Sequence, residues 1–213
     1  MADSFDFKKE YKDLYLPKTT PQFIEIPTMK FVQVEGQGNP NIPGGEYQKA
    51  VQILYSVSFT IKMSPKSDFV IPDYFTYIVP PLEGLWTLPE KPDNNIIDKD
   101  KLKWISMIRQ PEFVDEDIFS QVCEIIRRKK PEIDISKARF VEFSEGLCVQ
   151  CMHIGSYDDE PATIKKVYEF VEENGYELDF SDERKHHEIY LSDPRKTKVE
   201  NCKTVLRFPV RRK

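Results

Sequence analysis

His186-His187-Glu188-Ile189-Tyr190-Leu191-Ser192-Asp193-Pro194 is the stretch that decides how this chain folds. Its β-favouring residues, its alternation and its stop at Ser-Asp-Pro predict a strand. Side chains alternate between the two faces of a strand, so Glu188 and Tyr190 share one face while Ile189 and Leu191 share the other. The apolar pair marks the face that packs on the core. Glu188 therefore lies either on a solvated outer face or on the floor of a polar and aromatic cleft.

The composition limits the class of protein. Of the 213 residues, 39% are hydrophobic and 12% aromatic, which is enough for a packed core in one large domain or two fused small ones. The net charge of −5 and the pI near 5.4 argue against binding to nucleic acid or to an anionic membrane. No apolar segment reaches the ~18 residues of a membrane helix, and the N-terminus does not have the pattern of a secretion signal. These features, with four scattered cysteines, favour a cytoplasmic protein.

The order of predicted elements divides the chain into two similar halves. In the first half, the pattern predicts a strand over residues 31–35 and a helix over 47–58, whose apolar residues follow i, i+3, i+4, i+7 spacing. Two further strands are predicted over residues 73–79 and 83–88. The second half predicts the same order, with a strand over 148–154, a helix from about 160 to an Asn-Gly cap at 174–175, and strands over 186–191 and 204–210. Each half is thus strand, helix, strand, strand.

A helical insert is predicted between the halves. Asp98–Ile108 carries apolar residues at helical spacing, and Asp115–Lys130 begins with acidic and ends with basic residues, which complements the helix dipole. We expect one α+β domain over residues 1–213, with repeat one at about 23–90, the insert at about 96–131 and repeat two at about 138–211. Pairing two such repeats gives an antiparallel sheet with helices on one side.

Spacing argues against three other kinds of site. Cys148 and Cys151 are three residues apart on a strand, so their thiols point to opposite faces and cannot jointly hold a metal. Of His186, His187 and Glu188 only the first and the last share a face, and the one remaining histidine is His153, so neither a metal nor a cofactor is expected. The chain has no complete glycine-rich phosphate loop and no Gly-x-Ser-x-Gly turn.

Aromatic residues with polar tips accompany the acidic strand. Such residues at strand and helix spacing are most often part of the core. Several of them have a hydroxyl or an indole N–H, and together with an inward-facing Glu188 they are typical of a cleft that orients a ligand. The candidate ligand-binding residues are Trp86, Tyr77, Phe75, Trp104, Tyr190 and Phe208.

Segments in both halves resemble one protein family. In the first half they are Gly38-Asn39-Pro40, Leu54-Tyr55 and Tyr77-Ile78-Val79-Pro80-Pro81-Leu82-Glu83-Gly84-Leu85-Trp86. In the second half they are His153-Ile154-Gly155-Ser156-Tyr157-Asp158, the stretch from His187 to Pro194, and Lys203-Thr204-Val205-Leu206-Arg207. From about Phe23 onward, the chain resembles the GyrI-like small-molecule-binding domain, a fold that also serves as the multidrug-sensing domain of some MerR-type regulators.

The resemblance implies both a fold and a ligand class. Members of the family pair two strand-helix-strand-strand units around a cleft between the halves, which binds flat and often cationic aromatic molecules. Their acidic ligand contact on the penultimate strand corresponds to Glu188. Stand-alone members with the Glu-Gly-Leu-Trp stretch of residues 83–86 resemble a branch that hydrolyses cyclopropane-bearing, DNA-alkylating natural products. No helix-turn-helix segment accompanies the domain, so direct binding to nucleic acid is not expected.

Two functions remain open on the sequence. In the first, the chain is a detoxifying hydrolase, with Glu188 as the base that activates water, Tyr55 or Tyr77 as the donor to the ligand oxygen, and Trp86 and Trp104 stacking on the ligand. In the second, it is a non-catalytic protein that sequesters drugs or modulates a gyrase, and Glu188 offsets the charge of a cationic ligand. Both readings expect planar aromatic ligands, no membrane association, and a monomer or weak dimer.

Overall fold

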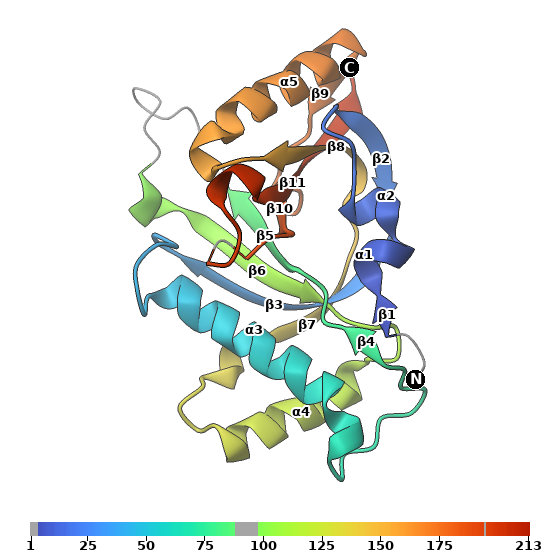
Figure 1. Ribbon diagram of the computed structural model, residues 1–213, viewed down its shortest axis with the longest axis vertical. Helices are drawn as coiled ribbons and strands as arrows, with labels where there is room; N and C mark the ends of the chain where they lie inside the picture. Colours follow the sequence, from blue (N-terminus) through green and yellow to red (C-terminus); the bar gives the residue numbers. More distant parts are fainter. Residues whose placement is uncertain (1–3, 88–97, 194) are drawn as a thin grey trace. The chain divides into compact units, whose positions relative to one another are not determined.

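The computed structural model describes residues 4–87, 98–193 and 195–213, which divide into two compact units (Figure 1). Among the described residues, unit 1 comprises 4–10, 29–80 and 98–143, and unit 2 comprises 11–28, 81–87, 144–193 and 195–213. Both units are discontinuous in sequence, because β5 (Leu82–Thr87) and β2 (Gln22–Ile26) belong to unit 2.

In unit 1, a three-stranded antiparallel sheet supports two helices. β3 (Met29–Gln37) lies between β6 (Lys103–Arg109) and β7 (Arg139–Phe143). Helix α3 (Glu46–Lys62) packs on β3 and β6, and α4 (Glu116–Lys129) packs on α3. The first turn of α4 is capped by Asp115, whose Oδ1 accepts a hydrogen bond of 2.8 Å from the Ile118 N–H, as the acidic start of this helix predicts. The N-terminal elements β1 (Phe5–Asp6) and α1 (Phe7–Glu10) lie beside β4 (Tyr77–Ile78), which pairs with β1 in parallel.

In unit 2, five antiparallel strands form the sheet. The strand order is β2, β8 (Gly146–Ile154), β11 (Lys203–Arg212), β10 (His186–Tyr190) and β5, and β9 (Tyr176–Leu178) pairs with the end of β11. Helix α5 (Glu160–Glu173) packs against β8, whereas the short helix α2 (Lys12–Tyr15) precedes β2. Asn174 caps α5, and Gly175 follows with a φ of 77°, so the Asn-Gly pair ends the helix where the sequence predicts.

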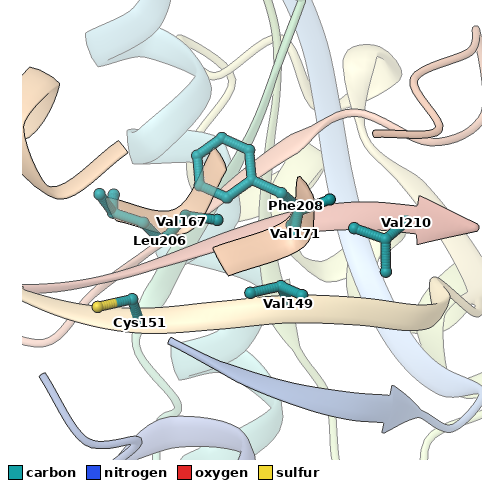
Figure 2. Packing of buried hydrophobic residues seen from close by; sticks show 7 residues of the cluster. All are labelled: Val149, Cys151, Val167, Val171, Leu206, Phe208 and Val210. Atoms are coloured by element: carbon teal, nitrogen blue, oxygen red, sulfur yellow. The ribbon is translucent and has the colours of Figure 1, made fainter. Parts of the chain in front are cut away.

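The hydrophobic core of unit 2 lies between α5 and two strands (Figure 2). It consists of residues that alternate along β8 and β11 and residues that follow helical spacing on α5: Val149, Cys151, Leu206, Phe208, Val210, Val167 and Val171. Full burial of such side chains contributes about 1.5–3 kcal/mol each to folding. Cys148 lies on the opposite face of β8 from Cys151, as the alternation predicts, and both thiols are free.

The α+β fold class predicted from the sequence is confirmed. In unit 1, β3 leads to α3 and then to β6, which pairs back on β3. In unit 2, β8 leads to α5 and later to β11, which pairs back on β8. Each unit thus contains an antiparallel sheet with its long helix packed on one side. The single-domain organisation and the cleft between the halves stay predictions.

The helix predicted over Asp98–Ile108 is wrong. Residues 103–109 form strand β6, which pairs with β3 from Phe31 opposite Arg109 to Gln37 opposite Lys103. Ile105 and Ile108 fit a helical period, but Ser106 and Met107 between them are fully buried. A strand buried on both faces shows no alternation, so its apolar run resembles a buried helix. The second predicted helix, Asp115–Lys130, is confirmed as α4.

The strand predicted over Asp73–Val79 is present only at Tyr77–Ile78. Asp73 has a φ of 55°, in the left-handed region, which turns the chain where the prediction required extended backbone. The strand predicted over Glu83–Leu88 corresponds to β5, and Leu88 lies outside the described residues. Within the described ranges, none of the helices is long and apolar enough to cross a membrane.

Candidate functional site

Strand β10 places Glu188 between two neighbouring strands of unit 2. Glu188 lies opposite Gly84 on β5 and opposite Leu206 on β11. In antiparallel pairs, opposite residues project to the same face. Leu206, opposite Glu188, belongs to the core that packs against α5, so the side of β10 that carries Glu188 is the side on which α5 packs. Ile189 projects to the other face and is buried, as predicted, whereas Leu191 follows the strand and is half-buried.

The Glu188 carboxylate is held by its neighbours on the same face of β10. Oε2 accepts a hydrogen bond of 2.8 Å from the Tyr190 hydroxyl, and Oε1 lies 3.2 Å from Nε2 of His186. The Tyr190 oxygen in turn accepts a bond of 2.9 Å from the Trp86 indole N–H. The Glu188 side chain is 13% exposed. Glu188 therefore lies among aromatic and polar groups, and the alternative of a solvated outer face is wrong.

Gly84 leaves the space that Trp86 and Tyr190 occupy. A Cβ atom at residue 84 would lie 2.9 Å from Trp86 Nε1 and 3.1 Å from the Tyr190 hydroxyl oxygen, closer than ordinary carbon contacts. This explains the Glu-Gly-Leu-Trp stretch. Gly84 makes room opposite Glu188, and Trp86, two residues on, projects to the same face.

We expect Gly84→Ala to lower the free energy of unfolding by about 1–3 kcal/mol, because the added methyl group overpacks a filled site. The substitution should also change the tryptophan fluorescence, because the Trp86 indole must move away from Tyr190. Urea unfolding followed by fluorescence and by circular dichroism measures both effects. Thr87→Ala, an exposed position on the same strand, is the control. Wild-type stability and emission in Gly84→Ala would contradict the packing described above.

The opposite face of β10 contains a buried network of charged residues. His187 Nδ1 and Arg207 Nη1 lie 2.9 and 2.8 Å from the same oxygen of Glu145, and His187 Nε2 lies 2.9 Å from Glu83. Burial alone would raise the pKa of Glu145, but the charges of His187 and Arg207 outweigh it and lower this pKa to about 2. Burial would lower the pKa of His187, but the adjacent Glu145 carboxylate outweighs that effect and raises it.

Arg207 extends this network to the backbone and to β8. Its Nη2 donates to the Leu14 carbonyl at 2.9 Å and to Gln150 Oε1 at 3.1 Å, and the whole side chain is buried. Tyr15 donates its hydroxyl proton to Glu83 at 3.3 Å. The network therefore connects β5, β8, β10 and β11 behind the strand that holds Glu188, and it fixes the register of that strand.

Glu160, the first residue of α5, is a second carboxyl near Glu188 that the sequence analysis missed. It is 8% exposed, and burial, followed by the charge of Glu188, raises its pKa to about 9. An acidic residue in the first turn of a helix is an ordinary feature because it complements the dipole. No pattern in the sequence therefore indicates that this carboxyl is buried.

Three of the predicted site residues of unit 2 come together: Glu188, Tyr190 and Trp86. The fourth, Phe208, is fully buried in the core beneath α5, and its ring stacks on that of His186 with 4.4 Å between centroids. His186 therefore connects the core to the carboxylate.

The predicted site residues of unit 1 lie in separate aromatic groups. Tyr77 is buried among Phe75, Tyr74 and Phe113, and burial raises the pKa of its hydroxyl. Trp104 is buried against Gly36 and donates to the Gly38 carbonyl at 3.2 Å. Tyr55 stacks on Phe59 of α3.

Comparison with known proteins agrees with this fold. The model of the GyrI-like small-molecule-binding domain matches residues 19–211. A hydrolase from Listeria innocua is 44% identical, with a TM-score of 0.88, and an uncharacterized conserved protein from the same organism is 46% identical, with a TM-score of 0.91. Each alignment covers 98% of this chain and 100% of the other.

A more distant likeness concerns the fold alone. The C-terminal domain of EcmrR is 14% identical, with a TM-score of 0.55 over 91% of this chain and 98% of that domain. No curated protein matches the chain. The family match covers nearly the whole sequence and agrees with the residues that carried the resemblance, and the chain belongs to the GyrI-like small-molecule-binding domain family.

Proposed function

We propose that the chain binds planar aromatic small molecules beside Glu188 and hydrolyses an electrophilic cyclopropane in the bound ligand. The observation that carries the proposal is the Glu188 carboxylate, which is largely buried, fixed by Tyr190 and His186, and connected through the Tyr190 hydroxyl to the indole of Trp86. A carboxylate positioned in this way can accept a proton from water, and the aromatic surroundings suit a flat ligand.

Ring opening needs few groups. In a cyclopropane joined to a cyclohexadienone, water attacks a cyclopropane carbon while Glu188 accepts a proton from that water. A C–O bond forms, the strained C–C bond breaks, and its electron pair moves through the ring to the dienone oxygen, which takes up a proton and becomes a phenol. No oxidant or reductant is consumed. The 44% identity to a protein described as a hydrolase supports this reaction class.

A non-catalytic binder is the second candidate, and one observation favours it. Both oxygens of Glu188 already have partners, Tyr190 and His186, which suits a carboxylate that acts only as a counter-charge. In that role Glu188 attracts a planar cation, and Trp86 adds cation–π attraction.

Turnover of a defined compound separates the two candidates. The purified chain is incubated with the simplest spiro-cyclopropyl cyclohexadienone, which water opens to the phenol tyrosol, and product is followed by absorbance. We expect tyrosol to form faster than in buffer with an equal concentration of an unrelated protein. Turnover no faster than this control, with intact binding of the planar cation ethidium, would reject the hydrolase and leave the binder.

Trp86→Ala should weaken ethidium binding by about tenfold, because aromatic stacking is worth ~1 kcal/mol beyond the area that it buries. Quenching of tryptophan fluorescence by ethidium should also decrease, because Trp104 then remains as the only tryptophan. Trp104→Phe serves as the matched control. Unchanged affinity and unchanged quenching in Trp86→Ala would show that Trp86 is a core residue without contact to the ligand.

A further inference from the structure

The start of α5 is held close to the Glu188 face of β10. The ring of Tyr157, three residues before α5 begins, contacts that of Tyr190 edge-on, with 6.2 Å between centroids. His153 on β8 anchors the same segment, because its Nε2 lies 2.9 Å from the Ser156 carbonyl and its Nδ1 lies 3.0 Å from the Thr163 hydroxyl. Since a carbonyl only accepts, Nε2 of His153 donates and Nδ1 accepts. These contacts fix the position of Glu160.

Glu160 is buried with an unmade hydrogen bond. Its Oε1 is inaccessible to solvent and has no hydrogen-bond partner among the described residues. An ionised carboxylate in this position would be strongly disfavoured, because it would lose water without gaining a donor. The dipole of α5 favours the ionised form, but helix dipoles shift a pKa by less than about one unit at exposed sites. Burial and the adjacent Glu188 charge prevail, and the pKa of Glu160 rises to about 9.

Two other donors near Glu188 are already used within the protein. The Tyr190 hydroxyl donates to Glu188, and the Trp86 indole donates to Tyr190. A carboxyl that keeps its proton beside a carboxylate that can accept one is the usual arrangement of an acid and a base in one site. Glu188 is the acceptor of the pair, and Glu160 is the carboxyl whose buried Oε1 has no hydrogen-bond partner among the described residues, so its protonated form can donate to a ligand.

We propose that Glu160 is the hydrogen-bond donor of this site and that it recognises a carbonyl or phenolic oxygen on a planar ligand. If the proposed hydrolase function holds, Glu160 also supplies the proton to the dienone oxygen during ring opening. This refines the ligand class to flat aromatic molecules with an oxygen acceptor at one edge. It also assigns to Glu160 the donor role that the sequence analysis gave to Tyr55 or Tyr77.

The number of protons is conserved in this step. One proton passes from water to Glu188, and another passes from Glu160 to the ligand oxygen. After ring opening Glu188 is neutral and Glu160 is ionised, so a single proton transfer from Glu188 to Glu160, directly or through a water molecule, restores both groups. No other reactant is required.

Two substitutions separate donation of a hydrogen bond from donation of a proton. Glu160→Gln keeps an N–H donor but has no transferable proton, whereas Glu160→Ala has neither. Binding is measured with the gem-dimethyl cyclohexadienone, which keeps the carbonyl but lacks the strained ring, and turnover is measured with the spiro-cyclopropyl dienone. Glu173→Gln, an exposed position on the same helix, is the matched control.

We expect Glu160→Gln to bind the gem-dimethyl dienone within about threefold of wild type and Glu160→Ala to bind it about tenfold more weakly, the usual effect of one lost hydrogen bond. Turnover of the spiro dienone should fall by about 10²-fold in both variants, the range for a general acid. Glu160→Ala should keep or raise Tm, because it removes a buried carboxyl with an unmade bond, whereas Glu160→Gln, which leaves a polar group there, should have a Tm close to that of wild type.

The outcomes distinguish this proposal from the hydrolase. In one outcome, the wild-type protein does not open the spiro dienone, and only Glu160→Ala binds the gem-dimethyl dienone more weakly. This outcome rejects the hydrolase function and keeps Glu160 as the hydrogen-bond donor. Turnover that is lost in Glu188→Gln but unchanged in both Glu160 variants keeps the hydrolase and overturns the role of Glu160. Dienone binding that is absent in wild type, or equal in wild type and Glu160→Ala, also overturns it.

Discussion

Glu188→Gln is expected to lower turnover of the spiro-cyclopropyl dienone by about 10²-fold or more, the usual loss when a general base is removed. The amide has nearly the same shape, and its oxygen can still accept the 2.8 Å hydrogen bond from Tyr190, so the fold should remain intact. It cannot accept a proton from water. Affinity for the uncharged gem-dimethyl dienone should therefore persist while kcat falls, which is the signature of an interaction needed only for the chemical step.

The same variant tests the non-catalytic alternative. If Glu188 acts only as a counter-charge, the affinity for ethidium should fall and that for the neutral dienone should not. Glu183→Gln removes one exposed carboxylate from the same unit and controls for the change in net charge. Wild-type turnover together with wild-type affinity for both ligands would show that Glu188 has neither role.

Alternation along one strand was sufficient to predict the face that carries Glu188. Tyr190 and His186 contact the carboxylate as that pattern requires, and Ile189 is buried on the other side. The pattern could not reveal what His187 contacts. Its partner Glu145 lies 42 residues away in sequence, and its pairing with Glu145 depends on the register of three strands. The sequence shows which side of the strand a residue occupies but not what lies across from it.

The errors in secondary structure have related causes. Strand β6 is buried on both faces, so its apolar residues fit a helical period as well as an extended one. Strands β2, β7 and β9 escaped prediction because they are short and their burial is incomplete. Each of these strands depends on a partner distant in sequence, such as β8 for β2. Local patterns are weakest where tertiary pairing decides the conformation.

Glu160 shows a different limit on what can be predicted from the sequence. An acidic residue at the start of a helix has a sufficient local explanation, so no sequence pattern separates it from a routine contribution to the helix dipole. Its unusual state comes from burial and from the charge of Glu188, which approaches through folding. By contrast, Gly84 and Trp86 were visible as a motif, although the reason for the glycine, the space required by Trp86 and Tyr190, appears only in the structure.

The buried network behind β10 should make stability depend on pH at both ends of the range. The folded-state pKa of Glu145, about 2, lies below its ordinary value of 4.5, so its stabilising contribution is present above 4.5 and is lost as the pH falls toward 2. The folded-state pKa of His187 is raised above its ordinary value of 6.5, so its contribution is complete below 6.5 and is lost as the pH rises through the folded-state value.

Arg207→Met is expected to lower the free energy of unfolding by about 3–5 kcal/mol, because it leaves the buried Glu145 carboxylate without its arginine partner. Leu14 and Gln150 also lose a donor. Urea unfolding at neutral pH measures the loss. Arg211→Met, on the same strand but with an exposed side chain paired to Glu177, should have a much smaller effect, because exposed ion pairs contribute little to stability. Equal effects of the two substitutions would show that burial of the Arg207 pair does not govern its energy.

A double variant separates loss of the ion pair from loss of packing. Glu145→Gln in the Arg207→Met background removes the carboxylate that was left without its arginine, so the double variant should be more stable than Arg207→Met alone. In the wild-type background, Glu145→Gln should be destabilising, because the buried Arg207 and His187 then lose the negative charge of the oxygen that they share. This reversal of sign is expected only if the charge on Glu145 is what Arg207 stabilises. A Glu145→Gln substitution that destabilises both backgrounds equally would mean that the two residues act independently, and the network would then consist of separate contacts.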